Sequence, residues 1–192
     1  MNPFCERFGL LSEQDAQVLE ATLAELAPLG KIKFLEIGMY QGRTGLGVKN
    51  WCDAHGVALD WWGLDSQRDT AAVAPFPEAT IRVGPSEEIY PDIPNDFNAI
   101  IIDGCHCRNH VILDTYNYMS KVLPGGFLLF HDTGPAIQGN DYQLHGPRIP
   151  EFHIRTLDAF AMIGWPHPGW TLFLEKFDAS LPFGGMQSYR RA

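Results

Sequence analysis

Two apolar runs of the sequence end in side chains that could do acid–base or metal chemistry. Asp103 and His106 follow the first run, and His131 and Asp132 follow the second. Carboxylate oxygens suit Mg²⁺ or a similar hard ion, and an imidazole can add a nitrogen ligand. Imidazole also titrates near neutral pH, which makes His106 the candidate general base. We therefore expect Asp103, His131 and Asp132 to hold a divalent cation, with His106 beside them.

Each of these residues also has a purely structural explanation. A lone histidine is often a hydrogen-bonded core residue, and an aspartate often caps a helix. Repetition favours function, because the same residue types follow two apolar strands whose ends should meet at one edge of a sheet.

A zinc site of Cys105, His106, Cys107 and His110 is a weaker alternative. Structural zinc sites usually space cysteines as C-x₂₋₄-C, and no second pair completes this one. We expect the cysteines to be small buried residues.

A glycine turn with an acidic residue on each side follows an earlier apolar run. Glu36, Gly38 and Gly42 form the pattern E-x-G-x-x-x-G, and Asp65 lies 23 residues after Gly42, at the end of the next apolar run. Glycines allow the backbone to approach a ligand closely, and a carboxylate at Asp65 could accept both hydroxyls of a ribose. Glu36 would repel a pyrophosphate but suits a cationic sulfonium or amino group. The plain alternative is a strand–turn–helix whose glycines only make the bend.

The segments that must position these residues alternate between strand and helix patterns. We expect strands at Ile32–Ile37, Leu59–Leu64, Thr80–Val83, Phe97–Ile102 and Phe127–Phe130, with Trp170–Glu175 as the last strand of the chain. We expect helices from Ser12 to just before Pro28 and at Arg43–Ala54, His110–Leu123 and Glu151–Ile163, with a helix or loop at Asp69–Ala74. This alternation predicts a doubly wound α/β fold with a mostly parallel sheet, in a single domain over residues 1–192. Residues 1–30 would form an N-terminal helical segment, and residues 134–150 a substrate loop.

Composition excludes some classes of partner. The 192 residues include 14 Lys+Arg and 23 Asp+Glu, a formal net charge of −9. No basic stripe is visible, so we expect neither nucleic acid nor an anionic membrane surface as a partner. No apolar run is long enough to span a bilayer, and the first residues lack the layout of a secretory signal. We therefore expect a cytoplasmic protein.

These motifs together resemble those of class I S-adenosylmethionine-dependent methyltransferases. Leu35–Thr44 resembles their first motif. Ile102–His106, Asp114 and Leu123–Thr133 are similar to a branch that includes macrolide sugar O-methyltransferases and the so-called cephalosporin hydroxylase proteins, related to the catechol-type enzymes. The resemblance implies a Rossmann-like class I methyltransferase fold and S-adenosylmethionine as the cofactor.

The resemblance also implies roles for single residues. The residues around the methionine part of the cofactor would be Glu36, Gly38, Tyr40 and Gly42. Thr44 and Asp103 would also belong to the cofactor-binding residues. Asp65 would hold the ribose, and Ser66 and Ser86 would lie near the adenine. In metal-dependent members an acid at the position of Asp103 and a pair at His131–Asp132 bind Mg²⁺, and the base occupies the place of His106. The chain departs from this pattern at His131, where those members have a carboxylate or an amide.

The expected function is methyl transfer to an oxygen of a hydroxylated small molecule: a sugar, a natural product or a phenol. A lid over that acceptor would come from Met1–Gly30, from Gly134–Pro150 or from a neighbouring subunit of a homo-oligomer. One alternative is a nicotinamide-dependent dehydrogenase on a similar sheet, disfavoured by Glu36 and by the missing G-x-G-x-x-G. The other is a catalytically inactive cofactor-binding protein, disfavoured by Asp103 and His106.

Overall fold

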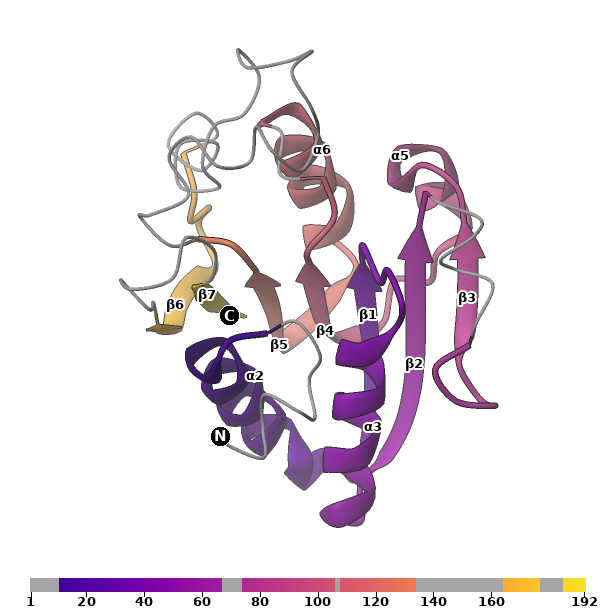
Figure 1. The fold of residues 1–192 in the computed structure, drawn as a ribbon. Helices are drawn as coiled ribbons and strands as arrows, with labels where there is room; N and C mark the ends of the chain where they lie inside the picture. Colours follow the sequence, from indigo (N-terminus) through magenta and orange to yellow (C-terminus); the bar gives the residue numbers. More distant parts are fainter. Residues whose placement is uncertain (1–10, 67–73, 106–107, 134–163, 177–184) are drawn as a thin grey trace.

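Five strands form the parallel part of one sheet (Figure 1). They are β1 (Lys31–Ile37), β2 (Ala58–Asp65), β3 (Thr80–Val83), β4 (Phe97–Ile102) and β5 (Val122–Phe130). Two further strands, β6 (Trp170–Lys176) and β7 (Met186–Arg191), are antiparallel, and the sheet order is β3-β2-β1-β4-β5-β7-β6. The computed structural model describes residues 11–66, 74–105, 108–133, 164–176 and 185–192. The predicted doubly wound, mostly parallel sheet is confirmed.

The register of the sheet brings the predicted strand ends to one level. Ile37 of β1 pairs with Leu64 of β2 on one side and with Ile102 of β4 on the other, and Ile102 pairs with Phe130 of β5. The residues that follow these four strand ends therefore leave the sheet side by side. The winding direction reverses between β1 and β4, and in such sheets ligands bind beyond the strand ends at that point.

Helices cover both faces of the sheet. Helices α2 (Glu13–Leu26) and α3 (Arg43–Ala54) pack on one face, and the short α5 (Ser86–Ile89) and α6 (Arg108–Met119) pack on the other (Figure 1). The first core contains Leu19, Val48 and Trp61, and the second contains Ile100 and Tyr118. Strand β4 contributes to both cores, which explains why its sequence is almost purely apolar. Among the described residues, no helix combines the length and the apolar character that crossing a bilayer would need.

Helix α2 begins directly after Ser12, the first residue of the predicted helix. The Ser12 hydroxyl accepts a hydrogen bond from the Asp15 backbone N–H at 3.2 Å, and the Asp15 carboxylate accepts one from the Ser12 N–H at 2.9 Å. Side chains at positions 15, 16, 18, 19, 22, 23 and 26 are buried, with helical spacing. Asp15 is therefore both a capping residue and a member of the buried face.

The prediction was wrong at two places. Pro124–Gly126 was expected to separate a helix from a strand, but α6 ends at Met119 and β5 already begins at Val122. The pairing of β4 with β5 shifts register after Phe97, so an irregularity accommodates the proline and glycines inside the strand. The chain also does not end its sheet with Trp170–Lys176, because β7 follows and lies between β5 and β6.

Strand β7 escaped prediction because it buries polar side chains instead of an apolar run. Gln187 and Ser188 are buried, and each has a partner: the Gln187 amide donates to Glu175 at 3.0 Å, and the Ser188 hydroxyl lies 3.0 Å from that of Thr22. The predicted helix Glu151–Ile163, the loop 134–150, most of Asp69–Ala74 and residues 1–10 lie outside the described residues.

Candidate functional site

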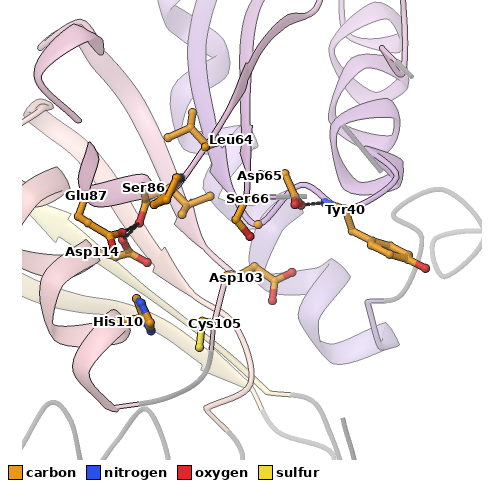
Figure 2. Close-up of a pocket in the computed structure, with 15 residues that line it drawn as sticks. Tyr40, Leu64, Asp65, Ser66, Ser86, Glu87, Asp103, Cys105, His110 and Asp114 are labelled. Atoms are coloured by element: carbon orange, nitrogen blue, oxygen red, sulfur yellow. Dashed lines mark hydrogen bonds between the residues drawn. The ribbon is translucent and has the colours of Figure 1, made fainter. Parts of the chain in front are cut away.

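A cavity of about 410 Å³ lies at the carboxyl ends of β1, β2 and β4 (Figure 2). Its lining includes six residues predicted to bind the cofactor: Gly38, Tyr40, Asp65, Ser66, Ser86 and Asp103. A second cavity of about 290 Å³ is lined by Glu36 and Thr44, and it shares Gly38, Tyr40 and Asp103 with the first. Eight of the nine predicted cofactor residues therefore line one cavity or the other.

Gly42 is the predicted cofactor residue that lines neither cavity. It is the N-cap of α3 and has a left-handed backbone with φ 68°, and a Cβ added there would lie 2.9 Å from the Pro75 side chain. Its glycine is therefore required by the turn into α3.

Gly38 allows the ends of β1 and β4 to lie against each other. Its φ is 86°, and a Cβ at this position would lie 2.2 Å from the Asp103 carbonyl oxygen and 2.5 Å from Gly104 Cα. The positive φ favours glycine, and the close backbone contact excludes any other residue without a shift of the backbone. The close approach places Asp103 directly beside the glycine turn.

Asp65 fixes the turn that follows Gly38. Its carboxylate accepts a hydrogen bond of 2.7 Å from the backbone N–H of Tyr40, drawn as a dashed line in Figure 2. Tyr40 has the left-handed φ of 46°, a conformation that costs about 1–3 kcal/mol and persists only where the surrounding structure imposes it. The carboxylate predicted to bind a ribose thus also shapes the wall of the cavity.

Glu36 is the buried acid of the site. Its carboxylate accepts hydrogen bonds from the Thr44 hydroxyl and the Gly45 backbone N–H at the start of α3. Its Oε2 is buried and has no hydrogen-bond partner among the described residues. Burial, and then the nearby negative charge of Asp103, raise the pKa of Glu36 well above its ordinary value. A cationic group of a ligand at Oε2 would supply the missing partner.

Ser86 joins the two helices on the other side of the larger cavity. Its hydroxyl donates to the Asp114 carboxylate of α6 at 2.5 Å (Figure 2). Its backbone carbonyl accepts from the Tyr118 hydroxyl at 2.7 Å. The sequence placed Ser86 near an adenine but gave no role to Asp114. Glu87, Cys105 and His110 also line this cavity. The sequence predicted no role for Glu87, and it placed Cys105 and His110 only in the weaker zinc alternative.

The predicted metal ligands Asp103, His131 and Asp132 come together at the ends of β4 and β5. Each offers one ligand atom, and these atoms lie within 4.8 Å of one another. His131 Nδ1 lies 2.8 Å from Asp103 Oδ1 and 3.5 Å from Asp132 Oδ2. Asp132 has a left-handed backbone with φ 54°. One nitrogen and two carboxylate oxygens therefore face a common point.

A third carboxylate contacts this cluster from α2. Asp15 Oδ2 lies 3.2 Å from His131 Nε2, so both nitrogens of the imidazole have carboxylate partners. Burial acts to lower the pKa of His131, but the charges of Asp103 and Asp132 outweigh it and raise that pKa well above its ordinary value. Burial likewise acts to raise the pKa of Asp15, but its hydrogen bond to His131 and the charge of that ring hold it below its ordinary value. The sequence predicted a helix over Asp15 and gave this residue no place in the site.

The comparison with known families decides what kind of protein carries this site. A family model described as a methyltransferase domain matches residues 35–133, more than half of the chain. The matched segment contains all four strand ends. The chain belongs to this methyltransferase family.

The methyltransferase has the fold of several solved structures, all at low sequence identity. Cofactor-bound Rv0187 from MTB is 16% identical with a TM-score of 0.65, and the match covers 97% of this chain and 84% of that one. An O-methyltransferase from Bacillus cereus in complex with SAH is 15% identical (TM-score 0.61, 94% and 84% covered). TomG from Streptomyces achromogenes, an O-methyltransferase involved in tomaymycin synthesis and solved with SAM, is also 15% identical (0.62, 90% and 79%).

The family match and the shared fold confirm the predicted class I methyltransferase and favour it over a dehydrogenase. A search of curated protein sequences finds no match to this chain. The narrower resemblance to macrolide sugar O-methyltransferases stays a prediction.

The remaining predictions concern the general base, the substrate loop and the cysteines of the methyltransferase. His106, Cys107, Cys5 and the substrate loop 134–150 lie outside the described residues, so the general base stays a prediction. Cys52 is buried as expected, whereas Cys105 is half-buried and lines the larger cavity. The helical spacing places the Asp15 carboxylate on the apolar face of α2. This placement indicates a buried acid with a specific partner, and the prediction did not use it.

The donor atoms of Asp103, His131 and Asp132 fit a divalent cation. Their geometry brings two carboxylate oxygens and one imidazole nitrogen to one point, and all three side chains are largely buried. Histidines that bind metals usually donate their second ring N–H to a carboxylate or a carbonyl, as His131 does toward Asp15.

Proposed function

We propose that this methyltransferase transfers the methyl group of S-adenosylmethionine to a hydroxyl oxygen of a small molecule. The observation that carries the proposal is the unpartnered Glu36 Oε2, buried at the glycine turn, in a residue that lines the smaller of two adjacent cavities. A buried polar atom without a partner costs about 1–3 kcal/mol. A ligand that brings a positive charge to this carboxylate removes that cost, and S-adenosylmethionine carries both an ammonium and a sulfonium.

Residues at the ends of β1, β2 and β3 would each bind a different part of the cofactor. S-adenosylmethionine, when bound, supplies a methyl group activated by a sulfonium. Glu36 and Gly38 would hold its amino acid part, Asp65 would accept the ribose hydroxyls, and Ser66 and Ser86 would lie along the adenine. The Tyr40–Asp65 hydrogen bond keeps the wall between the two cavities in place, which favours a fixed orientation of the methyl group.

The remaining residues would prepare the acceptor. A divalent cation held by Asp103, His131 and Asp132, when bound, would orient adjacent oxygens of the acceptor and lower the pKa of a hydroxyl. This chemistry suits a sugar, a catechol-like phenol or another natural product with neighbouring oxygens. His106, which follows Asp103 by three positions, would accept the proton of the attacking hydroxyl.

Two experiments test the proposal in turn. Titration calorimetry with S-adenosylhomocysteine and, separately, with NAD⁺ should give saturable binding of the first only. Incubation with S-adenosylmethionine labelled in its methyl group and a panel of sugars, catechols and primary amines should then transfer label to oxygen. Binding of NAD⁺ in preference to S-adenosylhomocysteine, or label found only on the amines, would refute the proposed function.

A further inference from the structure

Asp15 lies behind the strand-end cluster, and the proposed reaction gives it no role. Its carboxylate is fully buried and has partners in three separate segments. One oxygen, Oδ2, accepts hydrogen bonds from the Ser12 N–H and hydroxyl and lies 3.2 Å from His131 Nε2. The other, Oδ1, accepts from the backbone N–H of Gly185 at 2.9 Å. Helix α2 is thereby joined to the end of β5 and to the residue that precedes β7.

Capping explains only part of this arrangement. A capping box needs the two bonds between Ser12 and Asp15, and these form equally well on an exposed turn. A buried carboxylate, in contrast, is costly to desolvate and is retained where it has charged or hydrogen-bonding partners. Besides Ser12, the partners of the buried Asp15 carboxylate are the Gly185 backbone N–H and the His131 ring.

Asp15 contacts Nε2 of His131, and Nδ1 faces the cluster, 2.8 Å from Asp103 Oδ1 and 3.5 Å from Asp132 Oδ2. Ionised carboxylates only accept hydrogen bonds, so without a cation the ring donates from Nε2 to Asp15 and from Nδ1 to Asp103. A cation bound at Nδ1 would displace the proton of that nitrogen, and the bond to Asp15 would keep the other proton on Nε2. A ring held in this way presents its second nitrogen to the point where the two carboxylates meet.

We propose that Asp15 is a positioning residue which, by holding Nε2–H of His131, presents Nδ1 as a nitrogen ligand and gives the site a preference for Mn²⁺ over Mg²⁺. The inference rests on the cation site of the proposed function. Mg²⁺ takes oxygen ligands almost exclusively, whereas Mn²⁺ and the later divalent ions bind imidazole more readily. Replacing His131 by the carboxylate or amide of the resembled family would give an all-oxygen set, so the preference follows from this chain's own departure at that position.

The test uses the full chain and Mn²⁺ as the probe. The signal of free Mn²⁺ in electron paramagnetic resonance measures its binding, and displacement by Mg²⁺ measures the preference. The parent protein should bind Mn²⁺ at least tenfold more tightly than Mg²⁺. Asp15→Asn, which keeps the size of the side chain, should weaken Mn²⁺ binding by about 10–100-fold, the usual effect of losing the partner of a metal-bound histidine.

Two control variants separate positioning from stability. Glu13→Gln removes an acidic charge from the exposed side of the same first turn and should leave Mn²⁺ affinity unchanged. Ser12→Ala removes the cap and should lower the melting temperature while Mn²⁺ affinity is retained. If Ser12→Ala loses as much Mn²⁺ affinity as Asp15→Asn, or if Asp15→Asn binds Mn²⁺ as tightly as the parent, the proposal is overturned.

If the Asp15→Asn protein does not fold, a second variant tests the same inference. His131→Asn replaces the nitrogen ligand by an amide oxygen, and the ratio of Mn²⁺ to Mg²⁺ affinity should fall at least tenfold. An unchanged ratio, or a parent protein that binds Mg²⁺ as tightly as Mn²⁺, would contradict the inference. Calorimetry with S-adenosylhomocysteine on the same proteins keeps the two proposals apart. Failure of the parent to bind it removes the proposed function. A parent that binds S-adenosylhomocysteine but not Mn²⁺ removes the cation site and the inference about Asp15, and leaves the cofactor proposal in place.

Discussion

Asp65, at the end of β2, accepts a 2.7 Å hydrogen bond from the backbone N–H of Tyr40, which follows the end of β1. One carboxylate therefore fixes the left-handed turn of the neighbouring strand and faces the cavity in which we place the cofactor. The same side chain therefore shapes the wall of the cavity and offers it a hydrogen-bond acceptor.

Asp65→Ala should weaken binding of S-adenosylhomocysteine. Hydrogen bonds to a charged group are worth about 1.5–3 kcal/mol, or roughly 10–150-fold in Kd. Calorimetry measures the loss. Asp60→Ala on the same strand is the matched control, because Asp60 accepts from the Trp62 indole at 3.0 Å and lines neither cavity. Equal affinity of the Asp65→Ala and Asp60→Ala proteins would show that the ribose is not held by Asp65.

Gly38→Ala should destabilise the protein more than Gly56→Ala. Both glycines have a positive φ, so both variants strain the backbone, but an added Cβ meets nothing within 4 Å at Gly56 and meets the Asp103 carbonyl at 2.2 Å at Gly38. The difference isolates the steric clash, which should amount to about 1–3 kcal/mol. Urea unfolding of both variants measures it, and equal free energies of unfolding would mean that the β1 and β4 ends do not lie this close.

Glu36→Gln should stabilise the protein while it weakens cofactor binding. The amide does not ionise, so the free-energy cost of burying an ionisable carboxyl at neutral pH is removed, and so is the negative partner for a cationic ligand. At neutral pH the melting temperature of the ligand-free variant should rise by about 2–4 °C for each 1 kcal/mol recovered. Affinity for S-adenosylmethionine should fall in the same protein. A variant that melts lower and still binds as tightly as the parent would show that Glu36 is a structural acid.

The stabilisation by Glu36→Gln should depend on pH. The pKa of Glu36 in the folded protein lies well above its ordinary value, so the folded state holds this proton more tightly than the unfolded chain does. The parent therefore has its full stability below the unfolded pKa of about 4.3 and loses part of it as pH rises through the folded pKa. The difference in melting temperature between variant and parent should be small near pH 4.5 and large at pH 8. A difference that stays constant over this range would contradict the raised pKa.

His106→Ala should lower single-turnover methyl transfer by about 10²–10⁴-fold, the usual contribution of a positioned general base. Binding of S-adenosylhomocysteine and the melting temperature should stay near those of the parent. A histidine with a structural role gives the opposite combination, with stability lost and the transfer rate retained. Measuring both quantities on the same protein separates the two roles.

Sequence patterns were sufficient for the centre of this fold and insufficient for its edges. Buried parallel strands such as Phe97–Ile102 must be apolar on both faces, so their positions, and the polar residues directly after them, could be predicted. Strand β7 could not, because Gln187 and Ser188 are buried by virtue of partners elsewhere in the chain. Asp15 shows the same limit: its cap is a local pattern, but its contact with His131 joins residues 116 positions apart.

The bonds that join α2 to β7 have a consequence for the order in which this protein folds. Thr22 and Ser188 are separated by 166 positions, and Asp15 and Gly185 by 170. Contacts over such separations form late, because a long loop must close first. During synthesis on the ribosome, the parallel strands can assemble before β7, which supplies the partner of Thr22 in α2, has been made. Asp15 gains its full set of partners only when translation has passed Gly185, so the carboxylate behind His131 is fixed in place after the strands whose ends carry the cluster.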